Sequence, residues 1–355
     1  MRGGRTSCYP RTRRQACGEL VEPNVYAAEK GVKSGMGIDR SGRRLAYKRL
    51  VYVSLMLGMG ALIFSGDKSS ALDFSNPKIP VEQIMSGGPP KDGIPAILEP
   101  KFVSTKEADN FLNKDDIILG MSMEGISRAY PIKILNWHEI VNDKYKDRRV
   151  FVTYCPLCGT GMAFDSMVDG KRYSFGVSGL LFNSDVLFYD HQTESLWSQI
   201  IMGAVTGKMS GKSLTPLPVL HTTWENWKKK YPDTAALSLD TGYSRDYEHN
   251  PYGRYDKQDF IMFPVSVRDK RYHSKERVIG IKINGVARVY PYSELKKSKA
   301  PFPDSIGGKK VNVHFEADSS TAYITDEKGE QLSTIVGFWF AWYAFNPNAE
   351  VYTAK

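Results

Sequence analysis

Two cysteines in a C-x-x-C spacing are the residues of this chain best suited to chemistry. Cys155 and Cys158 are the only cysteines beyond residue 20, and they stand in the run TYCPLCGT, residues 153–160. Two thiols at this spacing can share a soft metal ion, act as a redox pair or close a small disulfide ring. Pro156 restricts the backbone inside the loop, and Gly159 relieves the turn after it. A packing role would need neither residue, so the pattern favours metal binding or thiol chemistry over a structural disulfide.

His138 is the third candidate, in a helix-like stretch ahead of the strand that leads to Cys155. Its helix is expected to pack over that strand, which would bring an imidazole near the thiols. Two cysteines and one histidine suit zinc or copper(I), and the softness of the thiolates favours copper. The sequence therefore predicts a metal site of Cys155, Cys158 and His138. A surface helix histidine, a thiol–disulfide redox pair and a binding module with a structural disulfide stay open as alternatives.

The elements that must position these residues occur twice. Residues 120–131 (GMSMEGISRAYP) match residues 280–291 (GIKINGVARVYP) at five of twelve positions. Each copy has the pattern of two strands joined by a tight turn, followed by a helix-like stretch and another strand. The cysteines lie in the first copy alone, since Glu316 and Ser319 stand at the matching positions of the second. This asymmetry favours a site in the first copy.

The predicted fold class is α+β, β-rich, with a duplicated β-hairpin–α–β unit and a meander insertion between the copies. Copy one covers about residues 101–165, the insertion about 166–270 and copy two about 271–326. An aromatic segment, residues 335–355, is expected to be buried and to close the core. Together residues 72–355 are expected to form a single exported domain.

The N-terminal region carries most of the charge. The net charge is +9, but residues 1–50 hold 12 Lys/Arg and 4 Asp/Glu, a net charge of +8, which leaves +1 for the other 305 residues. A nearly neutral remainder gives no nucleic-acid footprint. Within residues 36–71 a basic cluster, an apolar run of about 15 residues and a small polar stretch follow one another, as in an export signal or an N-terminal membrane anchor. Residues 1–35 are expected to be a disordered or mis-annotated extension.

The chemistry-bearing motifs allow a family comparison. The runs TYCPLCGTGMAFD, FGVSGLLFNSDVLFYD, TESLWSQ, NPYGRYD and FWFAWYAFNP together resemble the family of domain of unknown function 3179, over about residues 75–352. The resemblance implies an exported or membrane-anchored protein, periplasmic or otherwise extracytoplasmic, and no established activity. A fainter similarity links the cysteine loop to organomercurial lyases and copper chaperones. The sequence names no catalytic residue; a copper or zinc ion, or a small molecule, is the expected ligand.

Overall fold

The computed structural model describes residues 71–354. The predictions for residues 1–35 and for the apolar run of the export signal lie outside the described residues. The described residues fall within one compact unit, Asp67–Lys355. No helix among them is long and apolar enough to cross a membrane.

The segment that carries the cysteines begins with a hairpin. Its two-residue turn, Glu124-Gly125, has φ of 55° and 78°, the left-handed conformations that the tightest hairpins require. A short helix follows, and then three antiparallel strands. The elements are β3 (Ile117–Met123), β4 (Ile126–Pro131), α2 (Ile132–His138), β5 (Ile140–Tyr145), β6 (Arg148–Cys155) and β7 (Thr160–Asp165).

The second segment has the same order of elements. Asn284-Gly285, with φ of 49° and 86°, forms the matching hairpin turn. Three antiparallel strands again follow the helix. The elements are β17 (Arg277–Ile283), β18 (Val286–Pro291), α4 (Tyr292–Leu295), β19 (Phe302–Ile306), β20 (Lys309–Glu316) and β21 (Thr321–Asp326).

Each segment is completed by a strand, a helix and a short parallel strand from further along the chain. In both cases a helix tryptophan lies on a strand glycine: a Cβ atom on Gly120 would come within 2.4 Å of Trp227, and one on Gly280 within 2.4 Å of Trp342. Only glycine allows so close an approach. These elements are β15 (Leu220–Thr223), α3 (Trp224–Lys230) and β16 (Ala235–Leu237) for the first segment, and β22 (Ile335–Phe338), α5 (Trp339–Phe345) and β23 (Glu350–Val351) for the second.

Thr223 caps α3, since its side chain accepts a hydrogen bond from the Asn226 backbone N–H. Of the aromatic segment, residues 335–355, β22 is buried throughout and five of the seven residues of α5 are buried, whereas residues 345–354 are half-buried or exposed. Because β22 and α5 pack among the strands of both segments, the end of the chain closes the core.

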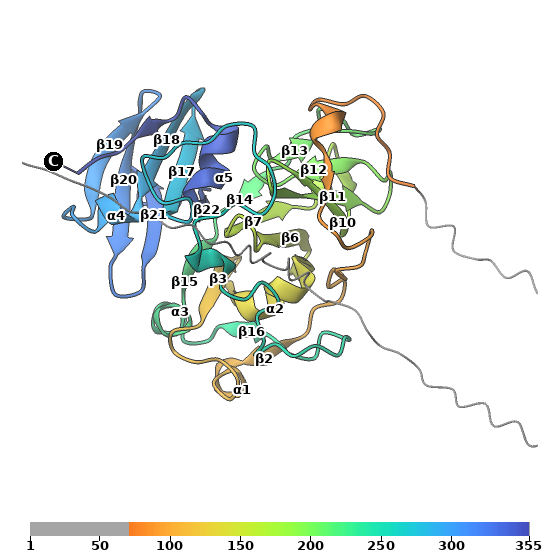
Figure 1. The fold of residues 1–355 in the computed structure, drawn as a ribbon. Helices are drawn as coiled ribbons and strands as arrows, with labels where there is room; N and C mark the ends of the chain where they lie inside the picture. The colour runs from red at the N-terminus through yellow and green to blue at the C-terminus, as the bar shows by residue number, and fades with distance from the viewer. Residues whose placement is uncertain (1–70, 355) are drawn as a thin grey trace, which may run out of the picture. The chain divides into compact units, whose positions relative to one another are not determined.

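Strands of both segments meet in one sheet. The eight-stranded sheet has the order β23-β18-β17-β22-β7-β6-β5, and β14 also pairs with β7. Thus β22 joins the hairpin of the second segment to the cysteine-bearing strands of the first (Figure 1). A five-stranded sheet, β15-β3-β4-β16-β2, and a three-stranded sheet, β19-β20-β21, hold the remaining strands of the two segments.

The predicted meander forms a separate five-stranded sheet, β1-β10-β11-β12-β13. Aromatic packing places it against β6: the ring of Phe151 stacks 3.9 Å from that of Phe175 and lies 5.5 Å from that of Phe188. This core therefore fixes the β10–β11 hairpin over the strand that ends at Cys155.

The remaining elements are η1 (Val81–Gln83), β1 (Met85–Ser86), β2 (Phe102–Ser104), α1 (Thr105–Ala108), β8 (Met167–Val168), β9 (Lys171–Arg172), β10 (Phe175–Phe182), β11 (Asp185–Asp190), β12 (Leu196–Ser198), β13 (Gly203–Ala204), β14 (Pro216–Leu217) and η2 (Tyr255–Lys257).

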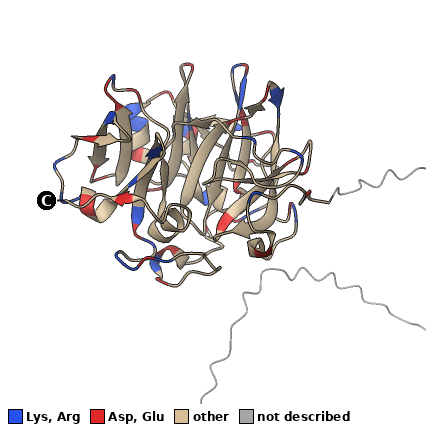
Figure 2. Cartoon of the chain, turned by 90° about the horizontal axis from the view of Figure 1, so that it is seen from above, with Lys and Arg blue, Asp and Glu red and all other residues tan. Residues whose placement is uncertain are grey.

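Charged residues of both signs are interspersed over the described part of the chain. Figure 2 shows Lys and Arg next to Asp and Glu along the same loops and strand ends. This distribution agrees with the small net charge beyond residue 50.

Candidate metal and thiol site

The cysteine loop is a tight connection between two paired strands. Cys155 ends β6 and pairs with Thr160, the first residue of β7. Gly159 has φ of 61°, and a Cβ atom there would lie 2.8 Å from the ring of Phe338, so the predicted turn role of this glycine is confirmed. The Phe338 backbone N–H donates a 2.8 Å hydrogen bond to the Cys158 carbonyl. The start of α5 and the end of β22 therefore hold the loop from one side.

The β10–β11 hairpin holds the loop from the other side. Phe182 pairs with Asp185, and the two-residue turn between them, Asn183-Ser184, has φ of 51° and 64°. The Asn183 side chain fixes this turn, because it accepts a 2.8 Å hydrogen bond from the Ser266 N–H and donates one of 3.4 Å to the Ala344 carbonyl. The hairpin tip is thus held in place by two distant segments of the chain.

The turn points its backbone at the thiols. The Ser184 carbonyl accepts from the Cys158 thiol at 3.2 Å and, more weakly, from the Cys155 thiol at 3.8 Å. Neither cysteine is in a disulfide. Both thiols are therefore present in reduced form, facing the first residue of β11.

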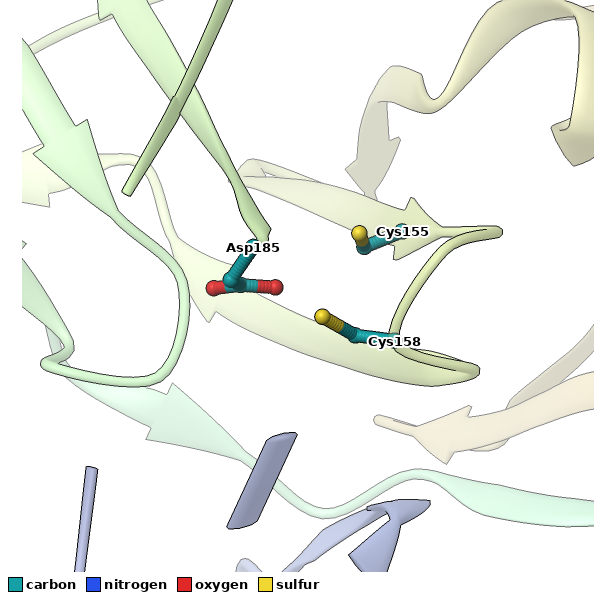
Figure 3. A group of neighbouring side chains, drawn as sticks. All are labelled: Cys155, Cys158 and Asp185. Carbon is teal, nitrogen blue, oxygen red and sulfur yellow. The ribbon is translucent and has the colours of Figure 1, made fainter. Parts of the chain in front are cut away.

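Asp185 completes a group of three ligand atoms. Figure 3 shows its carboxylate facing the two sulfur atoms across a common space. One carboxylate oxygen and both Sγ atoms all lie within 4.8 Å of one another. Asp185 and Cys155 are 1% exposed and Cys158 is 0% exposed. Neither carboxylate oxygen of Asp185 has a hydrogen-bond partner among the described residues, which is unusual for so buried a group.

Burial sets the protonation of this group in the absence of a cation. It raises the pKa of Asp185 to about 7 and raises the pKa of Cys155 above the usual thiol value. Burial raises the pKa of Cys158 further, and the neighbouring Cys155 adds to that shift. Each shift has the same origin, because an anion in a dry site loses its hydration. In the metal-free protein all three groups therefore hold their protons at low pH, and near pH 7 Asp185 begins to ionise while both thiols stay protonated.

Two more buried ionisable groups surround the three. Burial raises the pKa of Glu139 to about 7, and the Asp185 charge adds to this shift. Glu139 follows α2 with φ of 55°, and its carboxylate accepts a 3.2 Å hydrogen bond from the Tyr252 hydroxyl. Lys275 is the nearby cation: burial lowers its pKa to about 8, and the charge of Cys158 partly opposes this. The site thus combines several acids with one ammonium group.

The structure does not bring His138 to the cysteines. Its Nδ1 donates to the Pro95 carbonyl at 2.8 Å, and its Nε2 accepts from the Tyr247 hydroxyl at 2.8 Å. Both ring nitrogens are therefore engaged by partners other than the cysteines, and His138 stands outside the group of three ligand atoms. Burial lowers the pKa of His138, as suits a neutral imidazole between two such partners.

Comparison with known proteins supports the family resemblance. A family model described as a protein of unknown function (DUF3179) matches residues 91–349. The chain belongs to the DUF3179 family. Neither a search of curated proteins nor a search of solved structures gave a significant match. The DUF3179 match contains Cys155, Cys158 and Asp185, so the whole group lies in the region that defines membership.

Asp185 is the residue that sequence reasoning missed. It opens the apolar strand DVLFYD, where it was interpreted only as a strand residue. A signal was present, since a carboxylate inside a run of buried strand positions needs a partner. The sequence did not say that this partner would be the cysteine loop.

Proposed function

We propose that Cys155, Cys158 and Asp185 bind a single metal ion of the zinc or copper class. The observation that carries this proposal is the Asp185 carboxylate, buried beside two free thiols, with neither oxygen hydrogen-bonded to any residue that the structure describes. A buried carboxylate without hydrogen bonds is costly. A cation between it and the thiols would remove that cost, because a metal ion reverses the effect of burial on the pKa of its ligands.

The ligand set favours zinc over copper(I). Two thiolates alone suit copper(I), whereas a carboxylate oxygen beside them suits a harder divalent ion. Zinc sites with three protein ligands keep a fourth position open for water or substrate. The proposed centre is therefore of the open kind, which serves either metal transfer or catalysis.

The charge balance supports the same proposal. Two thiolates and one carboxylate carry three negative charges, and a divalent ion would neutralise two of them. Thiol–disulfide exchange is the weaker candidate, because an attacking thiol needs an accessible and acidic Sγ atom. Here both thiols are buried and their pKa values are raised.

The test is metal analysis of the purified full-length chain with Cys8 and Cys17 replaced by serine, so that the only thiols are those of the site. We expect about one equivalent of bound zinc or copper, and protection of both thiols from alkylation. Cys155→Ser/Cys158→Ser and Asp185→Asn are expected to lose the metal. His138→Gln is the matched control, because it removes a buried polar side chain outside the group and should keep the metal.

Two outcomes would contradict the proposal. One is a wild-type protein that takes up neither Zn²⁺ nor Cu(I). The other is a metal content unchanged in the double serine variant.

We propose further that the site works outside the cytoplasm, and that the two segments arose from one duplicated unit. The basic–apolar–small pattern of residues 36–71 supports export. Matching ion pairs support the duplication: Arg128 and Tyr130 both contact Asp143, while Arg288 and Tyr290 both contact Asp304. Protease protection in intact cells tests the proposed export. A domain in the cytoplasm would be protected from added protease until the cells are lysed.

A further inference from the structure

A cavity of about 370 Å³ lies against the outer face of the cysteine loop. Pro156, between the two cysteines, lines it together with Tyr154, Tyr252, Tyr255, Lys275 and Arg277. Its volume is at the lower end of the range for sites that hold small organic molecules. The metal proposal does not use this cavity, and its charges point to a ligand of their own.

Lys275 is the first of two cations without an acid partner. Its side chain is buried, at 5% exposure, and no carboxylate of the described residues lies within 4.0 Å of its Nζ. The Nζ donates to the Phe260 carbonyl at 2.7 Å and sits 3.9 Å from the centroid of the Tyr255 ring. The Nζ also lies 4.9 Å from the centroid of the Phe340 ring and 6.0 Å from that of the Phe338 ring. One carbonyl acceptor and these aromatic faces still leave a buried ammonium group with unused donors.

Arg277 is the second. Its Nη2 donates to His221 Nδ1 at 3.1 Å, and His221 Nε2 donates to the Gly161 carbonyl at 3.0 Å. This arrangement requires a neutral imidazole, and burial together with Arg277 lowers the pKa of His221 to about 3. Arg277 therefore donates one N–H to the neutral imidazole of His221, and it forms no ion pair among the described residues.

The cavity as a whole is positive. Asp256 is the acid in its lining, and it pairs with Lys257 at 3.1 Å. Aromatic rings make up much of the remaining wall, from Tyr154, Tyr252, Tyr255 and Phe338. A guanidinium group and an ammonium group suit a planar carboxylate, and flat aromatic walls suit a planar ring.

We propose that this cavity binds a small aromatic carboxylate, with the acid group between Lys275 and Arg277 and the ring against the tyrosines. The inference goes beyond the metal site and does not require a metal. It places an organic anion on the loop that carries both cysteines, so the bound molecule and the proposed centre are neighbours.

The test is calorimetric titration of the full-length protein with benzoate and 4-hydroxybenzoate, and with their neutral amides. We expect at least one acid to bind at least tenfold more tightly than its amide. Lys275→Met and Arg277→Met should each weaken that acid at least tenfold. Lys270→Met, the same charge change at an exposed lysine of the same region, should leave its Kd unchanged.

Several results would overturn the proposal. Equal binding of acids and amides would remove the role of the two cations, and so would an unchanged Kd in the Arg277→Met variant. If inorganic phosphate binds and neither aromatic acid does, the ligand needs no aromatic ring and the proposal is wrong. The acid–amide comparison uses the unaltered protein, so it holds even where the Lys275→Met variant does not fold.

Discussion

Asp185 and Glu139 are both buried carboxyl groups near the cysteines, yet their surroundings differ. Glu139 accepts a hydrogen bond from Tyr252, whereas Asp185 has no hydrogen-bond partner within residues 71–354 and lies within reach of both thiols. Glu139 also stands outside the group of three ligand atoms. The two residues therefore give different predictions, one about metal and one about protons.

Asp185→Asn should separate stability from metal binding. At about pH 8 the metal-free wild type must keep an unpaired carboxylate in a dry site, and the amide removes that charge. We expect the metal-free variant to be more stable than the metal-free wild type by about 1–2 kcal/mol in urea unfolding. Saturating zinc should reverse the order, because only the wild type gains the binding energy.

The control is Asp165→Asn, which removes a carboxylate that pairs with Arg148 at 2.8 Å. The Asp165→Asn substitution should not raise the free energy of unfolding, either with zinc or without it. A metal-free Asp185→Asn protein less stable than wild type would show that the carboxylate has a partner.

Glu139 should make the stability of the metal-free protein depend on pH. Its pKa is raised from 4.5 to about 7 in the folded chain, so between these values the folded state holds a proton that the unfolded state has lost. The free energy of unfolding therefore falls as pH rises through this window and levels off above about 7. The difference between wild type and Glu139→Gln isolates this effect, on the order of 2 kcal/mol.

The measurement is urea unfolding of both proteins between about pH 5 and pH 8, with a chelator present. Glu99→Gln, at an exposed position, controls for the loss of a carboxyl group. A wild type–Glu139→Gln difference that does not change with pH would be inconsistent with a buried, protonated Glu139.

At the scale of elements, the tip of the β10–β11 hairpin determines where Asp185 lies. Asn183→Gly keeps the left-handed turn but loses the hydrogen bonds to Ser266 and Ala344, and we expect a loss of about 1–2 kcal/mol. Asn183→Ala should cost about 1 kcal/mol more, because alanine also resists φ of 51°. Urea unfolding measures both, and equal stabilities for the two variants would rule out a strained turn.

The elements themselves were largely accessible from the sequence. The two hairpin turns and the C-x-x-C corner follow from the sequence because each depends on neighbours a few residues apart. The place of Asp185 does not, since its approach to the cysteines depends on Phe151 and the aromatic rings of the meander packing together. His138 was misplaced for a similar reason: α2 does pack near β6, but the rotation of a helix about its axis is a tertiary property.

At the scale of the whole molecule, β22 ties the two segments into one folding unit. It pairs with β17 on one side and with β7 on the other, and its Phe338 covers the cysteine loop. A strand shared in this way predicts a single cooperative transition for residues 71–354. Unfolding of the metal-free protein should therefore occur at the same urea concentration in every probe.

The probes are the tryptophan fluorescence of the wild type, which reports all six tryptophans together, and the alkylation of Cys155 and Cys158. Coincident midpoints from the two probes are expected. Thiols that react before the fluorescence changes would show that the cysteine loop opens by itself.

The β10–β11 hairpin, which brings Asp185 to the thiols, lies in the part of the predicted insertion between β7 and β15, since β15, α3 and β16 of that predicted range pack with the first segment. In the second segment the chain passes from β21 to β22 with only a short connection. The carboxylate that the metal proposal needs and the elements that the two segments share therefore come from different parts of the chain. A variant with a shortened insertion would keep both hairpins, both tryptophan–glycine contacts and the shared sheet, yet lose one of the three proposed ligands. Conversely, a comparable hairpin grafted onto the loop at Glu316–Ser319 would meet no thiols there, because Glu316 and Ser319 stand at the positions of the two cysteines.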